Sequence, residues 1–216
     1  MTLSLSELRA HRREQLAKRA HGATAVESKL WDIAESSPYG NKLITANNEG
    51  DPYLLRTYLS PDRKVLERQL TDGLGLQSET LLRIATYARP YLHFFFRGDE
   101  DREVHNHPWR RAVSLILVGG YKEYRWVSKY QKFSEHILKP GSLNLIGKKD
   151  FHRVELDQAV GCWTLFFSMD RMEESNGQDW HFLDTSTGEM IPWGSWDSRR
   201  SKPGWRADGA DRNDHT

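Results

Sequence analysis

The chain has a single cysteine, Cys162, among its 216 residues, which excludes an intramolecular disulfide and a cysteine-based zinc site. It also lacks an apolar run of the ~18 residues that a membrane-spanning helix needs. At the N-terminus, charged residues begin too early for the apolar stretch of a signal peptide. These absences predict a cytoplasmic protein with no membrane partner.

An excess of charge of one sign is lacking as well. The 31 Lys and Arg residues nearly balance the 30 Asp and Glu residues, for a formal net charge of +1. This balance gives no reason to expect nucleic acid as an obligatory partner. Only 38% of the residues are hydrophobic, but there are eight each of Trp, Tyr and Phe. We therefore expect one domain with a ring-rich core and polar extensions.

Residues 1–37 are predicted to form a helical extension. Ser4 with Glu7 and Thr24 with Glu27 have the spacing of capping boxes, and Gly22 separates the two helices. The first helix also carries a run of basic residues. These side chains form either a patch for a partner or a solvated helix face, and interleaved Glu7 and Glu14 favour the solvated face.

Residues 38–197 are predicted to form a β-rich domain. A β-hairpin is expected at Lys42–Ile44 and Pro52–Leu59, and a helical insertion at about 60–78, where leucines recur at helical spacing. Short strands separated by turns then predict an antiparallel sandwich or barrel. The expected strands are Leu81–Ala88, Tyr91–Arg97, Ala112–Val118, Tyr121–Val127, His136–Leu138, Ser142–Ile146, His152–Leu156 and Cys162–Ser168, followed by two closing pieces at Trp180–Leu183 and Glu189–Trp193. Residues 198–216 have the composition of a disordered tail.

Three histidines in this domain are candidate metal ligands. His105 and His107 are two residues apart, so on an extended strand both side chains project from the same face. Two such imidazoles can bind one ion at ~2.0–2.2 Å per bond. His152, at the start of a later strand, is the best candidate for a third ligand. His93 and His181 are more typical of packed side chains.

The segments around these histidines resemble the two motifs of the cupin superfamily. The first motif is represented by Gly98, His105, His107 and Gly119, and the second by Pro140, Gly141, the strand Ser142–Ile146 and His152. The resemblance covers roughly Pro90 to Met169. It implies a mainly β fold, a double-stranded β-helix (a cupin or jelly-roll barrel), here with N-terminal helices and one helical insertion. The sequence around the segments YLHFFF and HNHPW is also similar to that of uncharacterised cupin-like proteins encoded by bacteriophages.

The sequence departs from the cupin pattern at one ligand. Where the family has a glutamate, this chain has Arg111 or Ala112, so three histidines remain without a carboxylate. This set is similar to the three-histidine iron site of the thiol dioxygenases. The resemblance therefore implies one divalent metal ion, with iron preferred and nickel, manganese or zinc as alternatives.

Arg111 is the candidate for binding substrate. It shares the odd-numbered parity of His105 and His107, so it is expected to line the cavity mouth and bind a small anion, with Glu123 or Glu155 as a neutralising partner. The alternative is an outward-facing arginine at the sheet edge. Tyr121 has the same parity and is a second candidate for substrate binding.

Three functions remain open at this point. The first is a metalloenzyme with dioxygenase-like chemistry on a small anionic substrate, the second a non-catalytic module that binds a ligand or protein, and the third a metal-free isomerase or epimerase with a histidine base. The sequence assigns no catalytic residue, and a homodimer is possible.

Overall fold

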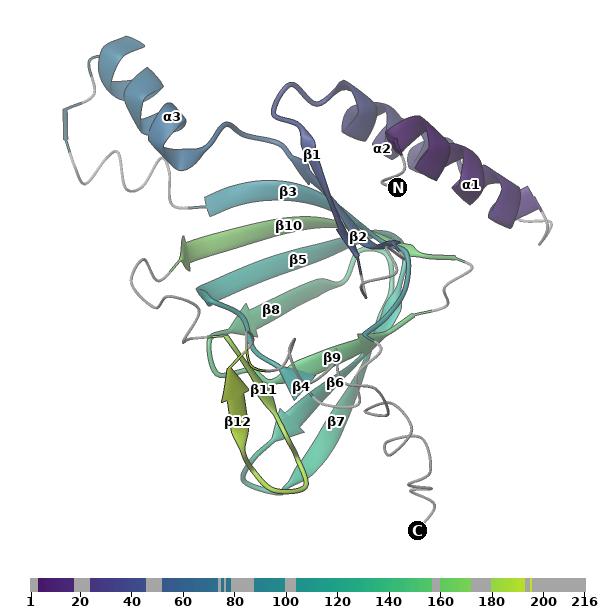
Figure 1. Ribbon diagram of the computed structural model, residues 1–216, viewed down its shortest axis with the longest axis vertical. Helices are drawn as coiled ribbons and strands as arrows, with labels where there is room; N and C mark the ends of the chain where they lie inside the picture. Colours follow the sequence, from purple (N-terminus) through teal and green to yellow (C-terminus); the bar gives the residue numbers. More distant parts are fainter. Residues whose placement is uncertain are drawn as a thin grey trace.

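A computed structural model describes residues 4–17, 24–45, 52–73, 75, 77–78, 88–99, 104–156, 160–171, 180–192 and 195. Two six-stranded β-sheets lie opposite each other, and the helices lie outside them (Figure 1). The helices are α1 (Leu5–Ala17), α2 (Ala25–Ser36), α3 (Arg63–Arg68) and the π-helical turn η1 (Gln69–Gly73). The strands are β1 (Asn41–Thr45), β2 (Pro52–Tyr58), β3 (Ala88–Phe95), β4 (Val104–His105), β5 (Trp109–Gly119), β6 (Tyr121–Val127), β7 (Lys132–Leu138), β8 (Leu143–Gly147), β9 (His152–Glu155), β10 (Cys162–Arg171), β11 (His181–Leu183) and β12 (Met190–Pro192).

The central eight strands form one long antiparallel hairpin that is wound into a barrel. β6 pairs with β7 at the hairpin's turn, and the pairs β5–β8, β4–β9 and β3–β10 follow outward along its two arms. Successive pairs alternate between the sheets, where these eight strands have the orders β3-β10-β5-β8 and β4-β9-β6-β7. This winding defines a double-stranded β-helix, so the predicted cupin-type jelly roll is confirmed.

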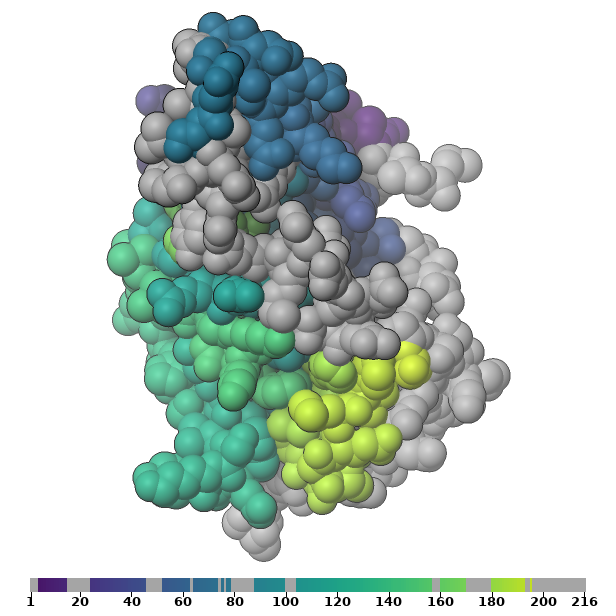
Figure 2. All heavy atoms as spheres, turned by 90° about the vertical axis from the view of Figure 1, so that its left-hand side faces the viewer, coloured from purple at the N-terminus to yellow at the C-terminus, as the bar shows by residue number. Residues whose placement is uncertain are grey.

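Each sheet is extended by one further hairpin. β1 and β2 pair at the predicted positions, and β2 joins the first sheet through β3. β11 and β12 join the second sheet through β4, close to the predicted closing pieces. In Figure 2, helix α3 lies at one end of the molecule and the β11–β12 hairpin toward the other. Trp193, the predicted strand at 81–87 and the tail 198–216 lie outside the described residues.

The predicted helical insertion is present as α3 and η1. Asp62 precedes helix α3, and its side chain accepts a hydrogen bond from the backbone N–H of Lys64 at 2.9 Å. This is an N-cap, which satisfies one backbone donor that the first helical turn leaves without a partner. The insertion lies between β2 and β3 in the chain, and these two strands still pair with each other.

Alternation along β5 and β8 separates the barrel's interior from its outer surface. Ala112, Ser114 and Ile116 are buried, and their neighbours in β5 are more exposed. On β8, Asn144 is buried whereas Leu143 is 63% exposed. Because side chains alternate along a strand, the buried set points into the barrel and the other set points outward.

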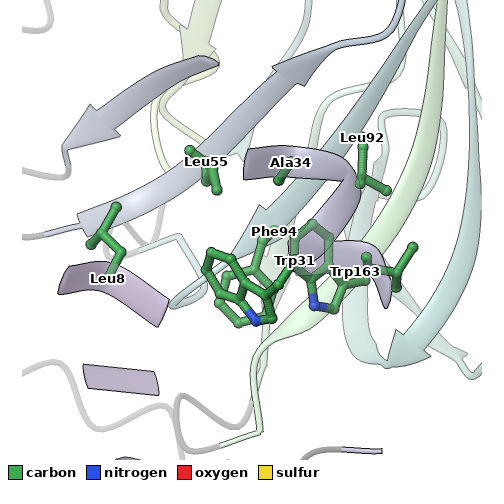
Figure 3. Close-up of a cluster of buried hydrophobic side chains, with 8 residues drawn as sticks. Leu8, Trp31, Ala34, Leu55, Leu92, Phe94 and Trp163 are labelled. Atoms are coloured by element: carbon green, nitrogen blue, oxygen red, sulfur yellow. The ribbon is translucent and has the colours of Figure 1, made fainter. Parts of the chain in front are cut away.

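Helices α1 and α2 cover the outer face of the first sheet. Trp31 of α2 packs against Phe94 of β3 and Trp163 of β10, with ring centroids 5.3 and 5.1 Å apart (Figure 3). Leu8 of α1 and Leu55 of β2 belong to the same buried cluster. This cluster lies outside the barrel, so the chain has a second apolar layer in addition to the barrel's own interior.

Ion pairs connect the two helices. Arg12, 2% exposed, contacts Glu27 at 3.4 Å and also donates a hydrogen bond to the carbonyl of Val160. Arg9 pairs with Asp32 at 2.7 Å and with Glu35 at 2.5 Å. The expectation of a solvated basic face is therefore wrong for these two arginines, because they face α2.

Within the described residues, no helix is long and apolar enough to cross a membrane.

Replacing Trp31 with alanine tests the contribution of this outer layer. Removing a buried ring of this size leaves a cavity, and such changes typically cost about 3–5 kcal/mol. We expect that loss in the free energy of unfolding, measured by urea denaturation. The matched control is Ile33→Ala on the same helix, where the side chain is 45% exposed and a change within about 0.5 kcal/mol is expected. Equal losses for both variants would contradict the proposed role of the cluster.

Candidate metal centre

The three candidate histidines come from two neighbouring strands and the segment between two sheets. His105 ends β4 and lies directly opposite His152, the first residue of β9. His107 follows β4, in the short segment that leads into β5. The wound hairpin thus brings together residues that are far apart in the sequence.

The intervening residue, Asn106, explains how this segment is held. Its side chain is 6% exposed, donates to the carbonyl of Lys148 at 3.2 Å and accepts from the backbone N–H of His181 at 2.7 Å. Asn106 therefore connects the segment to the turn after β8 and to β11. His181 contributes backbone groups to this arrangement, and its side chain is not part of the histidine group.

The geometry of the three histidines fits a single metal ion. The Nε2 atoms of His107 and His152 are 2.9 Å apart, and one ligand nitrogen from each histidine lies within 4.8 Å of the others. This spread is slightly wider than the ~4 Å expected from two ligand bonds of ~2 Å. Among the described residues, the group able to hold a metal consists of these histidines alone. The donor set is thus three imidazoles without a carboxylate.

His152 is oriented by a buried carboxylate. Its Nδ1 lies 2.5 Å from Oε1 of Glu123, a side chain that is 1% exposed. A proton on Nδ1, donated to the carboxylate, leaves the lone pair on Nε2 directed toward His107. Carboxylates that hydrogen-bond a histidine ligand in this way fix its tautomer and raise its basicity.

Glu123 is itself held by polar groups of the barrel interior. Arg125 donates to Oε2 at 2.8 Å, and the Asn144 amide donates to Oε1 at 2.9 Å. Burial raises the pKa of Glu123, but the hydrogen bond and charge of His152, with the hydrogen bonds from Arg125 and Asn144, lower the pKa to about 2. The carboxylate therefore stays ionised at neutral pH.

The other two histidines are neutral at neutral pH. Burial lowers the pKa of His105 to about 4, against the opposing charge of Asp99. Burial also holds the pKa of His107 well below its ordinary value, and the charges of neighbouring histidines and Arg56 lower it further. Neutral imidazole is the form that binds a metal, so both residues are ready to act as ligands.

Arg111 does not lie at the cavity mouth. It is exposed, and it belongs to the outward-facing set of β5, next to buried Ala112. The parity argument fails because the chain leaves the second sheet after His105 and enters the first sheet at Trp109, passing Pro108 between them. Strand alternation does not carry across that break. The proposed pairing of Arg111 with Glu123 is also wrong, because Glu123 faces His152 inside the barrel.

Tyr121 lies inside the barrel, in the polar network behind Glu123. Its side chain is 7% exposed, and its hydroxyl accepts a hydrogen bond from the Asn144 amide at 3.1 Å. Burial raises the pKa of Tyr121 far above its ordinary value, so the phenol remains protonated. Tyr121 thus adjoins the residues that hold Glu123, and its predicted contact with substrate remains a prediction.

Arg56 and His93 lie in the barrel interior, and neither was predicted to be part of the site. Arg56 on β2 donates a hydrogen bond from its Nε to Nε2 of His93 on β3, at 3.0 Å. The ring of His93 stacks on Phe166, and Trp109 stacks on His107, with centroids 4.8 and 5.0 Å apart. The only sequence signal for this arrangement was the shared parity of His93 with Tyr91 and Phe95, which indicates a face but does not show what that face adjoins.

Comparisons with known proteins find similarity only to solved structures. No protein-family model matches the chain, and no curated protein matches it. The chain is similar to an oxalate oxidase in complex with the substrate analogue glycolate (14% identity, 38% of this chain, 42% of that chain, TM-score 0.32). It is also similar to a cupin superfamily protein from Desulfitobacterium hafniense (14%, 54% and 76%, TM-score 0.32) and to Fe(II)-HppE with an alternative substrate (9%, 78% and 100%, TM-score 0.39). The match thus spans less than half of the oxalate oxidase chain.

The strand order and the histidine group together define the fold and the kind of site. The fold is a cupin-type double-stranded β-helix, and its three histidines could hold a metal ion. The predicted resemblance is therefore confirmed for the fold. The suggested similarity to phage-encoded proteins stays a prediction.

Replacing Glu123 with glutamine tests the support of His152. The amide has the shape of the carboxylate without its charge, and loss of such a partner typically lowers metal affinity 10–100-fold. We expect that decrease in a metal-competition titration. Glu155→Gln is the matched control, because Glu155 is exposed and pairs with Arg153 and Tyr124. Equal metal affinity in the two variants would show that Glu123 does not support the ligand.

A second prediction concerns the pH dependence of stability. Burial, followed by the charge of Arg56, holds the pKa of His93 well below 6.5. The unfolded chain takes up a proton at His93 near pH 6.5 that the folded chain does not, so stability falls as the pH is lowered below that value. One such group contributes up to about 1.4 kcal/mol per pH unit. His93→Gln, measured by denaturation in chelator, is expected to flatten the decline between about pH 6 and pH 5; an unchanged slope would contradict the assignment.

Proposed function

We propose that this protein is a metal-dependent cupin enzyme that acts on a small anionic substrate, with dioxygenase-like chemistry and iron as the preferred metal. The observation that carries the proposal is the convergence of three imidazoles, with no carboxylate among them. Such a ligand set leaves the full charge of a divalent ion in the site, which favours an anionic ligand.

The chain's own residues would hold the metal and control its surroundings. His105, His107 and His152 are the ligands, and Glu123 orients His152 through its Nδ1 proton. A bound divalent ion would supply Lewis acidity and open positions for substrate. On the side of His107, Trp109 and Phe166 form an apolar wall that limits the access of water.

A metal-free isomerase or epimerase is the second candidate. The hydrogen-bonded series Glu123, His152 and His107 resembles a relay in which a carboxylate supports one histidine and that histidine contacts another. A histidine in such a series can act as a general base without a metal. A binding module without catalysis remains the third candidate, and turnover of a substrate would separate it from both enzymes.

Metal analysis of protein purified without chelator tests the proposal. We expect about one divalent ion per chain in the wild type. His107→Ala is expected to lose the ion, because two histidine ligands bind it with lower affinity than three. His136→Ala is the matched control, since His136 is an exposed histidine of the edge strand β7 and is not one of the three proposed ligands. Circular dichroism establishes that each variant is folded.

The outcomes separate the candidates. Wild-type protein that contains no metal, and binds none when titrated with Fe(II), Ni(II), Mn(II) or Zn(II), would overturn the proposal in favour of metal-free chemistry or binding. If iron is bound, oxygen consumption in the presence of small carboxylates tests the dioxygenase assignment. We expect consumption that His107→Ala abolishes and His136→Ala preserves.

A further inference from the structure

The strand that carries His105 is very short and lies between two neighbours. β4 consists of Val104 and His105, with β9 on one side and β11 on the other. A single pair, His105 with His152, joins β4 to β9. Two pairs join it to β11, namely Phe182 with His105 and Leu183 with Val104. So short a ladder contains few hydrogen bonds, and the position of His105 therefore depends on β11 as well as on β9.

The contact with β11 continues into the segment between two of the ligands. The backbone N–H of Asn106 donates to the carbonyl of His181 at 3.1 Å, and the Asn106 side chain accepts from the backbone N–H of His181 at 2.7 Å. The Asn106 amide also donates to the carbonyl of Lys148. One residue of β11 is thus bonded twice to the residue between His105 and His107, and the segment that carries both ligands is held from the side of β11.

A buried ring of the β11–β12 hairpin packs against the first ligand. The ring of Phe182 lies beside the imidazole of His105, with centroids 5.6 Å apart. Phe182, Leu183 and Ile191 are all buried, and Ile191 of β12 pairs with Phe182 across the hairpin. Burial of these apolar side chains favours the docked position of the hairpin. The packing of Phe182 also limits the orientations open to the His105 ring.

The hairpin joins the second sheet through β4 alone. Among the described strands, β12 pairs only with β11, and β11 pairs with β12 and β4. The hairpin lies at the surface of the molecule (Figure 2). A change in its position would therefore be transmitted first to β4 and to the segment that follows, where two of the three histidines lie.

We propose that docking of the β11–β12 hairpin on β4 regulates the metal affinity of the three-histidine group, with Asn106 as the positioning residue that connects them. This inference rests on the proposed function, because it concerns the regulation of the proposed metal site. The docked hairpin holds His105 and His107 facing His152, whereas a detached hairpin leaves β4 with one pair to β9. Such coupling is reciprocal, so a bound ion stabilises the docked hairpin by the factor by which docking raises metal affinity.

Metal affinity of Asn106→Ala tests the coupling from the side of the protein. The probes are Zn(II) and Ni(II), both of which suit imidazole ligands, measured in competition with a chromophoric chelator. We expect the affinity to fall about tenfold or more, as is typical when a group that orients metal ligands is lost. The matched control is Asn41→Ala. Asn41 also bonds to a backbone carbonyl, that of Ala34, and to the Thr57 hydroxyl, but it belongs to β1 of the other sheet. We expect its loss to leave metal affinity unchanged.

Hydrogen exchange tests the coupling from the side of the metal. We expect Zn(II) or Ni(II) to slow amide exchange in β11–β12 more than in β1–β2, the outer hairpin of the first sheet. An ion that stabilised only the barrel as a whole would slow both hairpins equally. In Asn106→Ala saturated with metal, the difference between the hairpins is expected to shrink. If this variant does not fold, as judged by circular dichroism, the comparison of the two hairpins in the wild type decides.

The outcomes separate this inference from the proposed function. Wild-type metal affinity in folded Asn106→Ala, or equal slowing of the two hairpins, overturns the regulation by the hairpin and leaves the metal site in place. A wild-type protein that binds neither ion overturns the regulation as well, and the proposed function then depends on the wider set of metals tested above.

Discussion

The site depends on one buried charge, the carboxylate of Glu123. Removing a carboxylate from water is costly unless hydrogen bonds and opposite charge compensate. Here His152, Arg125 and Asn144 compensate together, and each comes from a different part of the wound hairpin. The requirement to satisfy Glu123 therefore fixes the relative positions of β6, β8 and β9. The orientation of His152 is a result of that requirement.

Much of the fold and part of the site could be predicted from the sequence, because both depend on local patterns. The alternation in β5 and β8, the capping pairs of α1 and α2, and the spacing of His105 and His107 are all local features. The contribution of Glu123 could not be predicted in the same way. Its contact with His152 depends on the register of β6 with β9, which pairs Glu123 with Val154 and Arg125 with His152.

The two arginines show where strand parity is informative and where it is not. Within β5, alternation correctly separates Ala112 from its neighbours. The same alternation does not hold between His107 and Arg111, because the chain changes sheets near Pro108. Parity counted from His107 therefore assigns Arg111 to the wrong face. Arg56 lies on the inner face for a reason that no local pattern contains, namely the non-local pairing of β2 with β3. An arginine was thus correctly expected inside the barrel, but the residue is Arg56 on β2 and not Arg111 on β5.

The wound hairpin also has a consequence for folding kinetics. Val127 and Lys132, at its turn, are close in sequence, whereas Ala88 and Met169, at its outer end, are far apart. Because the entropy of loop closure rises with sequence separation, pairing is favoured to begin at β6–β7 and to proceed outward to β3–β10. The β6–β9 contact that joins Glu123 to His152 forms partway through this sequence of events. Strand β2 and the covering helices α1 and α2 pack on β3, so we expect them to dock last, onto a barrel whose histidines are already assembled.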